Sequence, residues 1–197
     1  MLATFVIILI GLHQPQSARA DPTRNEAKAQ APEVIIETSL GNINVELWPD
    51  KAPATVKNFL SYVDRDFYDG TIFHGVIKGF MLQGGAFTSD MKMKDTDAPV
   101  KNEARADTPN ERGALAMLRS PDVDSATSHF FINLADNPFL NHKNATANDF
   151  GFCVFGKVTE GLEIVDKIGA VQTKGGFRPD KDEPATIVLI KSISRVE

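Results

Sequence analysis

The segment from residue 71 to residue 85, TIFHGVIKGFMLQGG, could support only a few kinds of chemistry, because it contains seven large apolar or aromatic residues and four glycines. Gly79 and Gly84 have the four-residue gap of a phosphate-binding loop. However, Gly85 and Ala86 stand where such a loop needs the lysine and the serine or threonine that contact phosphate and Mg²⁺. Glycines in or after strands more commonly mark bulges or a close approach of the backbone. The segment therefore does not predict a nucleotide site.

Residues that could act as nucleophiles or metal ligands are also poorly placed. Ser128 and His129 are neighbours in an expected strand, so their side chains point to opposite faces and cannot form the hydrogen bond that activates a serine. The other histidines after residue 20, His74 and His142, do not have the spacing of metal ligands. Cys153 lies in the apolar run FGFCVFG, which predicts a small buried hydrophobe rather than a reactive thiol. We therefore expect neither hydrolytic chemistry nor a metal or cofactor.

What remains is a set of aromatic, apolar and amide side chains, consisting of Phe73, Phe80, Met81, Gln83, Phe130, Phe131, Phe139 and Leu140. The simplest interpretation places all of them in a hydrophobic core. Strand alternation argues against this for some, because the neighbours Phe130 and Phe131 in HFFINL must face opposite sides of their strand. In a barrel, one side is the packed interior and the other meets a helix, solvent or a ligand. An apolar ligand groove is thus the alternative to a hydrophobic core for some of these residues. Composition alone does not indicate where such a groove would lie.

The elements that would position these side chains begin with a hairpin and a helix. Two β-rich runs flank residues 40–42 and predict the hairpin. The helix is predicted to begin near Pro53 and to bury one stripe, made of Val56, Phe59, Leu60 and Val63.

Short apolar runs separated by turn residues follow, namely TIFHGVI, FMLQGG, GALAML, HFFINLA, FCVFGKV and ATIVLIKSI. A second helix interrupts them in TEGLEIVDKIGAV, where Leu162, Val165 and Ile168 have helical spacing. Many short strands with two isolated helices favour an antiparallel barrel or sandwich over βαβ repeats.

Charge and the N-terminal residues limit the class of protein further. The chain of 197 residues has a formal net charge of -5, which does not suggest a nucleic-acid partner. Residues 2–12 form an apolar run that is shorter than the roughly 20 residues needed to span a bilayer, and Ala18-Arg19-Ala20 offers a small-x-small cleavage site. We expect a cleaved signal peptide at 1–20, a flexible tether at 21–33 and one domain at 34–197. A buried helix or an uncleaved anchor is the alternative for the first 20 residues.

Five stretches in order carry a resemblance to a known family: FHGVIKGFMLQGGAFT, KNEA, ERGALAML, SATSHFFINLADNPFL and FGFCVFGKVTEGLEIVDKI. From about Val34 to its end, the chain resembles a cyclophilin of the exported bacterial kind. The resemblance implies an all-β fold, an eight-stranded antiparallel barrel capped by two α-helices. It also implies peptidyl-prolyl cis-trans isomerase activity, with the substrate held in a groove on the outer surface of the barrel.

This activity explains why the first segment has so few groups that can gain or lose a proton. Rotation about an Xaa-Pro bond breaks no covalent bond, and the barrier, about 18–20 kcal/mol for peptide bonds, comes from amide resonance. An apolar pocket holds the ring and removes the imide from water. Catalysis then depends on binding the twisted state more tightly than either planar isomer.

The resemblance also implies roles for individual residues. The proline-ring pocket would be formed by Phe80, Met81, Phe131 and Leu140. Gln83 would hydrogen-bond the substrate backbone. An edge segment that contacts the residue before proline would consist of Leu118, Arg119 and Ser120. Phe139 stands where many eukaryotic members have tryptophan, which predicts weak binding of cyclosporin.

Two positions depart from the family pattern. The family's FHRVI is FHGVI here, so Gly75 replaces an arginine thought to donate a hydrogen bond to the prolyl nitrogen. The glutamine of the family's SQFF is His129. Loss of a preorganised donor at a transition state costs ~10²–10³ in rate, which predicts a slow enzyme or a protein without activity.

A substitute for the missing arginine has to come from elsewhere in the groove. Lys78 would lie on the face opposite Gly75 in an extended strand. Arg119 and His129 are the candidates near the groove, and a protonated His129 is the preferred one. If a protonated His129 replaces the arginine, the activity should rise as the pH falls through ~6.5, where histidine titrates. The expected catalytic set is therefore Phe80, Gln83, His129 and Phe131, with Gly75 on the substrate-binding surface.

The sequence thus predicts a monomeric, periplasmic prolyl isomerase that acts on extended or unfolded polypeptides without a metal or cofactor. The alternative is a non-catalytic module or holdase that retains proline segments in the same groove. An unrelated barrel that binds a small apolar ligand would require the motif matches to be accidental.

Overall fold

The structure is a computed structural model, and it describes residues 31–174 and 184–196. The expected signal peptide and residues 21–30 of the expected tether lie outside the described residues. In the described part, no helix has the length and apolar character needed to cross a membrane.

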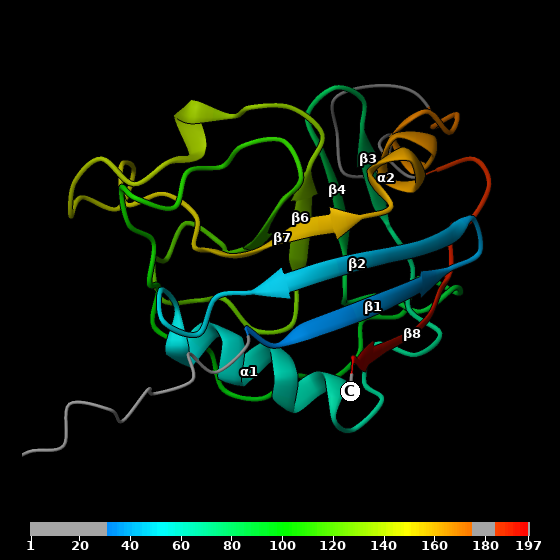
Figure 1. Ribbon diagram of the computed structural model, residues 1–197, viewed down its shortest axis with the longest axis horizontal. Helices are drawn as coiled ribbons and strands as arrows, with labels where there is room; N and C mark the ends of the chain where they lie inside the picture. Colours follow the sequence, from blue (N-terminus) through cyan, green and yellow to red (C-terminus); the bar gives the residue numbers. More distant parts are fainter. Residues whose placement is uncertain (1–30, 175–183, 197) are drawn as a thin grey trace, which may run out of the picture. The chain divides into compact units, whose positions relative to one another are not determined.

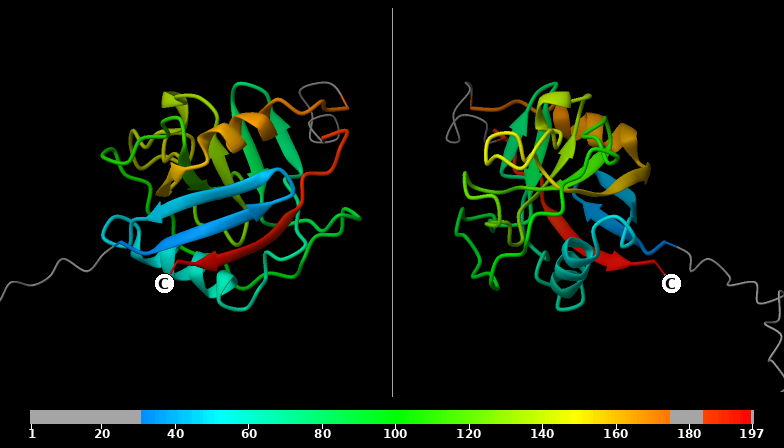
Figure 2. Two further views of the ribbon diagram at one scale, coloured as in Figure 1. Left: turned by 45° about the vertical axis from the view of Figure 1, so that its right-hand side comes forward. Right: turned by 90° about the vertical axis from the view of Figure 1, so that its left-hand side faces the viewer.

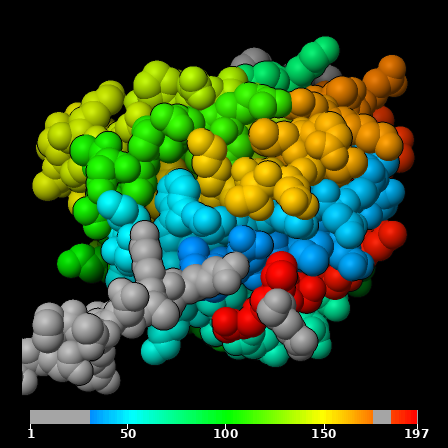
Figure 3. Space-filling model, viewed as in Figure 1, coloured from blue at the N-terminus to red at the C-terminus, as the bar shows by residue number. Residues whose placement is uncertain are grey.

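Eight antiparallel strands form one curled sheet, as the resemblance implied (Figure 1). Their order in the sheet is β3-β4-β6-β5-β7-β2-β1-β8. The strands are β1 (Glu33–Thr38), β2 (Gly41–Leu47), β3 (Gly75–Ile77), β4 (Met81–Gly84), β5 (Ala114–Met117), β6 (Phe130–Asn133), β7 (Val154–Glu160) and β8 (Ile190–Arg195). On the face shown in Figure 3, β2, β1 and β8 lie side by side, with β7 and α2 (Leu162–Gly169) next to β2.

The edges of the sheet meet in the segments that precede β3 and β8. The backbone N–H of Phe73 donates to the carbonyl of Val188 at 3.0 Å, and that of Ile190 donates to the carbonyl of Thr71 at 2.8 Å. Of TIFHGVI and ATIVLIKSI, only the last residues lie in the regular strands β3 and β8. Their first residues instead bring the two edge strands together.

The predicted hairpin and both predicted helices are confirmed. β1 and β2 pair antiparallel across a turn at residues 39–40, and Gly41, the first residue of β2, pairs with Thr38 and has a φ of 138°, which suits a residue without a Cβ. Helix α1 (Pro53–Val63) buries the predicted stripe, Val56, Phe59, Leu60 and Val63. Helix α2 is shorter than the predicted segment and buries Val165 and Ile168. The two helices lie at opposite ends of the curled sheet (Figure 2).

Alternation along the strands divides the apolar side chains into two groups. Val76, Leu82 and Phe130 point into an inner core, where the Phe59 ring of α1 lies 5.9 Å from the Phe130 ring. Phe131, the neighbour of Phe130, belongs instead to a second apolar group on the other face of the sheet. The sequence predicted that these two phenylalanines would be separated.

Candidate active site

The second apolar group is a compact patch on the outer face of the sheet, which we call the outer cluster. Its buried members are Met81, Ala114, Ala116, Phe131, Leu140 and Val154. Packed against them and partly buried are Trp48, Ile77, Phe80, Leu118 and Phe152. Strand register builds it, because Phe131 of β6 pairs with Gln83 of β4 on one side and with Ala116 of β5 on the other.

The four residues expected to form a proline pocket all lie in the outer cluster. Phe131 has no exposed surface, and Met81 and Leu140 are also buried, whereas Phe80 is partly exposed. Leu140 comes from a 3₁₀ helix, η1 (Pro138–Leu140), which the sequence analysis did not anticipate. The structure thus brings together side chains that are up to 60 positions apart in the chain.

Phe139 lies at the rim of the outer cluster. Its side chain is 62% exposed, and its ring stacks on that of Phe80 with the centroids 5.5 Å apart. The stack joins η1 to the residue that precedes β4.

Phe152 is a member of the outer cluster that the sequence analysis missed. Its ring lies edge-on to that of Phe131, at 5.6 Å between centroids. Alternation in FGFCVFG was the available signal, because Cys153 and Phe155 join the inner core while Phe152 and Val154 join the outer cluster. Trp48 was also missed; its indole N–H donates to Glu46 Oε1 at 2.7 Å.

The expected edge segment contributes Leu118 to the outer cluster, but its arginine is engaged with nearby backbone. Arg119 Nε donates to the carbonyl of Gly151 at 3.0 Å, and Nη2 donates to that of Ala147 at 3.0 Å. Its guanidinium also lies 5.0 Å from the centre of the Phe152 ring. Ser120 is exposed and bonds to Ser125. These contacts place the Arg119 guanidinium against the 147–152 loop.

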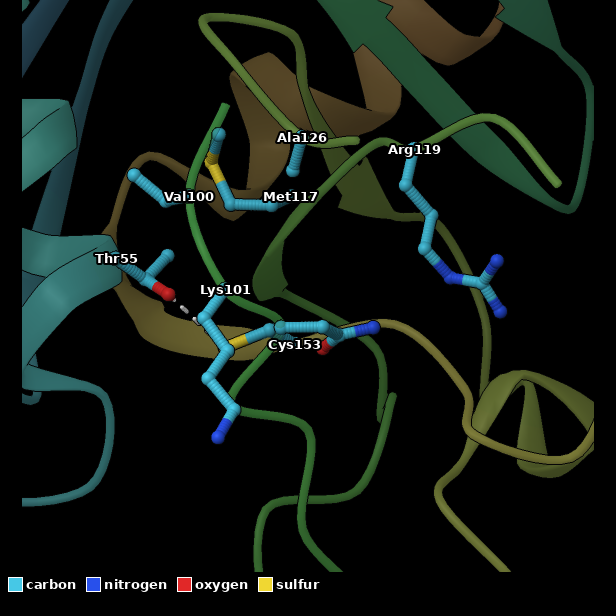
Figure 4. Close-up of a pocket in the computed structure, with 8 residues that line it drawn as sticks. Thr55, Val100, Lys101, Met117, Arg119, Ala126 and Cys153 are labelled. Carbon is cyan, nitrogen blue, oxygen red and sulfur yellow. Dashed lines mark hydrogen bonds between the residues drawn. The ribbon is translucent and has the colours of Figure 1, made fainter. Parts of the chain in front are cut away.

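Arg119 also lines a small cavity of about 10 Å³, together with Thr55 and Cys153. In Figure 4 its guanidinium extends away from these two residues. Cys153 Sγ lies 3.5 Å from Thr55 Oγ1, and burial raises the pKa of the thiol to about 11. The thiol therefore stays protonated at neutral pH. Cys153 is the buried hydrophobe that the sequence predicted.

The volume above Gly75 is filled by Gln83, its partner across the β3–β4 ladder. A Cβ built on Gly75 would lie 2.7 Å from Gln83 Oε1 and 3.1 Å from Gln83 Cβ. The Gln83 amide has only a weak contact of its own, from Nε2 to Met81 Sδ at 3.4 Å. A neutral amide thus lies over Gly75, where the resemblance implies an arginine side chain.

His129 lies next to other aromatic rings. Its ring is 5.8 Å from those of His74 and Phe87, measured between centroids. Burial lowers the pKa of His129, so the imidazole is neutral at neutral pH. Among the described residues, no group of three or more His, Cys, Asp or Glu side chains could hold a metal ion.

Comparisons with known proteins agree with this architecture. Residues 33–195 match the family model described as cyclophilin type peptidyl-prolyl cis-trans isomerase/CLD. The chain is 53% identical over 159 residues to peptidyl-prolyl cis-trans isomerase A of Dickeya dadantii, covering 81% of this chain and 82% of that protein. It is 47% identical over 161 residues to peptidyl-prolyl cis-trans isomerase B of Escherichia coli, covering 82% and 98%.

A solved structure gives the same result for the fold. The cyclophilin type peptidyl-prolyl cis-trans isomerase of Cryptosporidium parvum, crystallised in the presence of the dipeptide Ala-Pro, superposes with a TM-score of 0.70 at 27% identity. The match covers 84% of this chain and 99% of that one. The chain therefore belongs to the cyclophilin-type peptidyl-prolyl cis-trans isomerases.

Proposed function

We propose that this isomerase holds the proline ring of extended or unfolded polypeptides in the outer cluster, and that Gly75 lowers its rate. The observation that carries the proposal is the convergence of Phe80, Met81, Phe131 and Leu140 on one apolar patch. Such a patch suits a reaction in which no proton moves. That reaction requires a pocket that fits the twisted state and excludes water more than it requires titrating groups. Because Phe131 is fully covered, the ring reaches it only when partly exposed side chains of the cluster shift aside.

Gln83 supplies the hydrogen bond to the substrate in this proposal. Its side chain lies over Gly75, and its amide makes one weak contact, so it can turn toward a bound peptide at little cost. An amide is a weaker donor than a guanidinium, because hydrogen bonds from charged donors are roughly twice as strong as neutral ones. The twisted imide would therefore be less stabilised here than by an arginine.

The test is NMR exchange spectroscopy on an Ala-Pro peptide with the wild type, Gly75→Arg and Gly75→Ala. The wild type is expected to speed cis-trans exchange, and Gly75→Arg to speed it at least about tenfold more, since a preorganised donor is worth ~10²–10³. Gly75→Ala is the matched control, because it displaces Gln83 in the same way but adds no donor. It is expected to be slower than the wild type. Equal rates for Gly75→Arg and the wild type would show that Gly75 does not limit the reaction.

A holdase is the second candidate, and the glycine at position 75 together with the engaged guanidinium of Arg119 favours it. The same experiment separates the two functions. Peptide resonances that shift on binding without faster exchange in the wild type would support the holdase.

We also propose that the protein is exported to the periplasm and acts there on folding polypeptides as a monomer. The support for export is the apolar run at residues 2–12 followed by Ala18-Arg19-Ala20. Weak cyclosporin binding, from the phenylalanine at position 139, stays a prediction.

A further inference from the structure

Three buried asparagines lie directly beside the outer cluster. Asn110, Asn133 and Asn137 are 1%, 0% and 4% exposed. A buried amide is costly unless its donors and acceptor are hydrogen-bonded. Each of the three therefore needs hydrogen-bond partners inside the protein.

Their side chains form a chain in which each amide donates to the next. Asn137 Nδ2 donates to Asn133 Oδ1 at 2.8 Å, and Asn133 Nδ2 donates to Asn110 Oδ1 at 3.3 Å. Asn133 Nδ2 also donates to the carbonyl of Ala114 at 3.1 Å, and the backbone N–H of Asn137 donates to the carbonyl of Asn110 at 2.8 Å. The bonds run in one direction, so the orientation of each amide is fixed by its neighbours.

The two ends of this asparagine chain, Asn137 and Asn110, hydrogen-bond to the backbones of two residues of the expected proline pocket. Asn137 Nδ2 donates to the carbonyl of Phe80 at 3.0 Å, and Asn110 Nδ2 donates to that of Leu140 at 3.2 Å. Although Asn137 precedes η1, its side chain makes no capping bond to that helix. It instead bridges from η1 to the residue before β4.

The middle member of the asparagine chain, Asn133, lies on the strand that carries Phe131. Asn133 lies two residues after Phe131 on β6, so both side chains point to the same face, and it pairs with Met81 of β4. The asparagine chain therefore connects the backbones of Phe80 and Leu140 to β6, the strand between β4 and β5.

We propose that Asn137, Asn133 and Asn110 are positioning residues for prolyl isomerisation, which set the separation of Phe80 and Leu140 around Phe131. The inference rests on the proposed function, in which the outer cluster holds the proline ring. Amides do not titrate between pH 5 and 9, so this positioning works equally across that range. Loss of a link would let the pocket walls drift apart, and a displacement of about 1 Å can cost up to ~10² in rate.

The test compares Asn137→Ala, Asn110→Ala and the double variant by peptide exchange at several peptide concentrations. Each single change is expected to lower kcat/KM about tenfold, chiefly through KM, with an unchanged pH profile. The double variant is expected to be no worse than the poorer single variant, because one cut already breaks the chain. Losses that multiply in the double variant, or an unchanged KM, would overturn the proposal.

The matched control for stability is Val34→Ala, which removes buried apolar atoms from β1 in the inner core. It should lower the melting temperature but leave kcat/KM unchanged at temperatures where the protein is folded. If Val34→Ala lowers kcat/KM as much as the asparagine variants do, their effect is general destabilisation and the proposal is wrong.

A measurement on the wild type decides the question if the variants do not fold. On adding the Ala-Pro peptide, the side-chain amide resonances of Asn133 and Asn137 should shift, while that of Asn44, which bonds Glu160 on the surface, should not. If the methyl resonance of Met81 shifts but both asparagine amides stay still, the positioning proposal fails alone. If Met81 does not shift either, the proposed site fails and this inference fails with it.

Discussion

At the scale of single residues, the resemblance of FHGVI to the family's FHRVI predicts that Gly75 takes the place of an arginine. The local consequence of a glycine at this position is not visible in the sequence. That the side chain of Gln83 covers the glycine depends on the pairing of β3 with β4 and on the rotamer of Gln83. Arg119 is a similar case, because its backbone acceptors Ala147 and Gly151 lie about 30 positions further along the chain.

His129 gives a prediction about stability and pH. Burial lowers the pKa of His129 in the folded protein, whereas in the unfolded chain the imidazole should titrate at ~6.5. The stabilisation is therefore complete above that value and is lost as the pH falls toward the folded pKa. In urea unfolding at pH 7.5 and 5.5, the wild type should lose more stability at the lower pH than His129→Gln. The facing titratable group is His74, which both proteins retain.

Two results would count against this account of His129. One is an equal loss of stability in His129→Gln, and the other is a larger loss in the variant than in the wild type. The lowered pKa of His129 also affects the expectation that its protonated form replaces the arginine. Any increase in activity from that proton would occur below pH 6.5, at more acidic values than the sequence alone indicated.

At the scale of elements, the N-terminus of α1 is stabilised from a distance. Its N-cap residue, Ala52, offers no side-chain hydrogen bond. Instead, Glu103 accepts hydrogen bonds from the backbone N–H groups of Ala54 and Thr55, at 3.2 and 2.8 Å, and from Thr55 Oγ1 at 2.8 Å. A carboxylate is favoured at this end of a helix by the exposed N–H groups and the helix dipole.

We expect Glu103→Ala to lower the free energy of unfolding by about 1–2 kcal/mol, the usual cost of removing a helix cap. Chemical denaturation measures it. The matched control is Glu111→Ala, whose exposed pair with Lys157 at 3.5 Å should contribute less than about 1 kcal/mol. Equal effects of the two changes would mean that Glu103 does not act as the cap.

Local pattern predicted the elements better than it predicted the links between them. Helix α1 and the β1–β2 hairpin were identifiable because their periodicity and turn residues are contiguous in sequence. The role of Glu103 in KNEA was not, since its partners in α1 are 48 and 49 positions away. The asparagine chain was missed for the same reason, because an isolated asparagine in a sequence gives no sign of its buried partners.

At the scale of the whole molecule, the strands and helices of the described residues lie between residues 33 and 195, so the sheet begins one residue before the predicted boundary at 34. The eight-stranded barrel with two helices was predicted correctly, whereas the outer cluster is more tightly packed than a simple open groove. The sequence could not indicate this, because the covering of Phe131 depends on side chains from several strands and from η1.

Removal of the first 20 residues should therefore leave the enzyme intact. We expect the protein isolated from the periplasm to begin at Asp21 by mass spectrometry. Its melting temperature and its kcat/KM should equal those of a chain produced without export and beginning at Asp21. An intact N-terminus on the exported protein would contradict the expected cleavage, and a lower melting temperature of the chain beginning at Asp21 than of the full chain would contradict the predicted domain boundary.

Trp48, which packs against the outer cluster, is the one tryptophan of the chain. All indole fluorescence therefore originates beside the surface that is proposed to receive the peptide. The native protein carries a built-in optical sensor there, so changes in emission intensity or wavelength can follow ligand entry in real time without an attached dye.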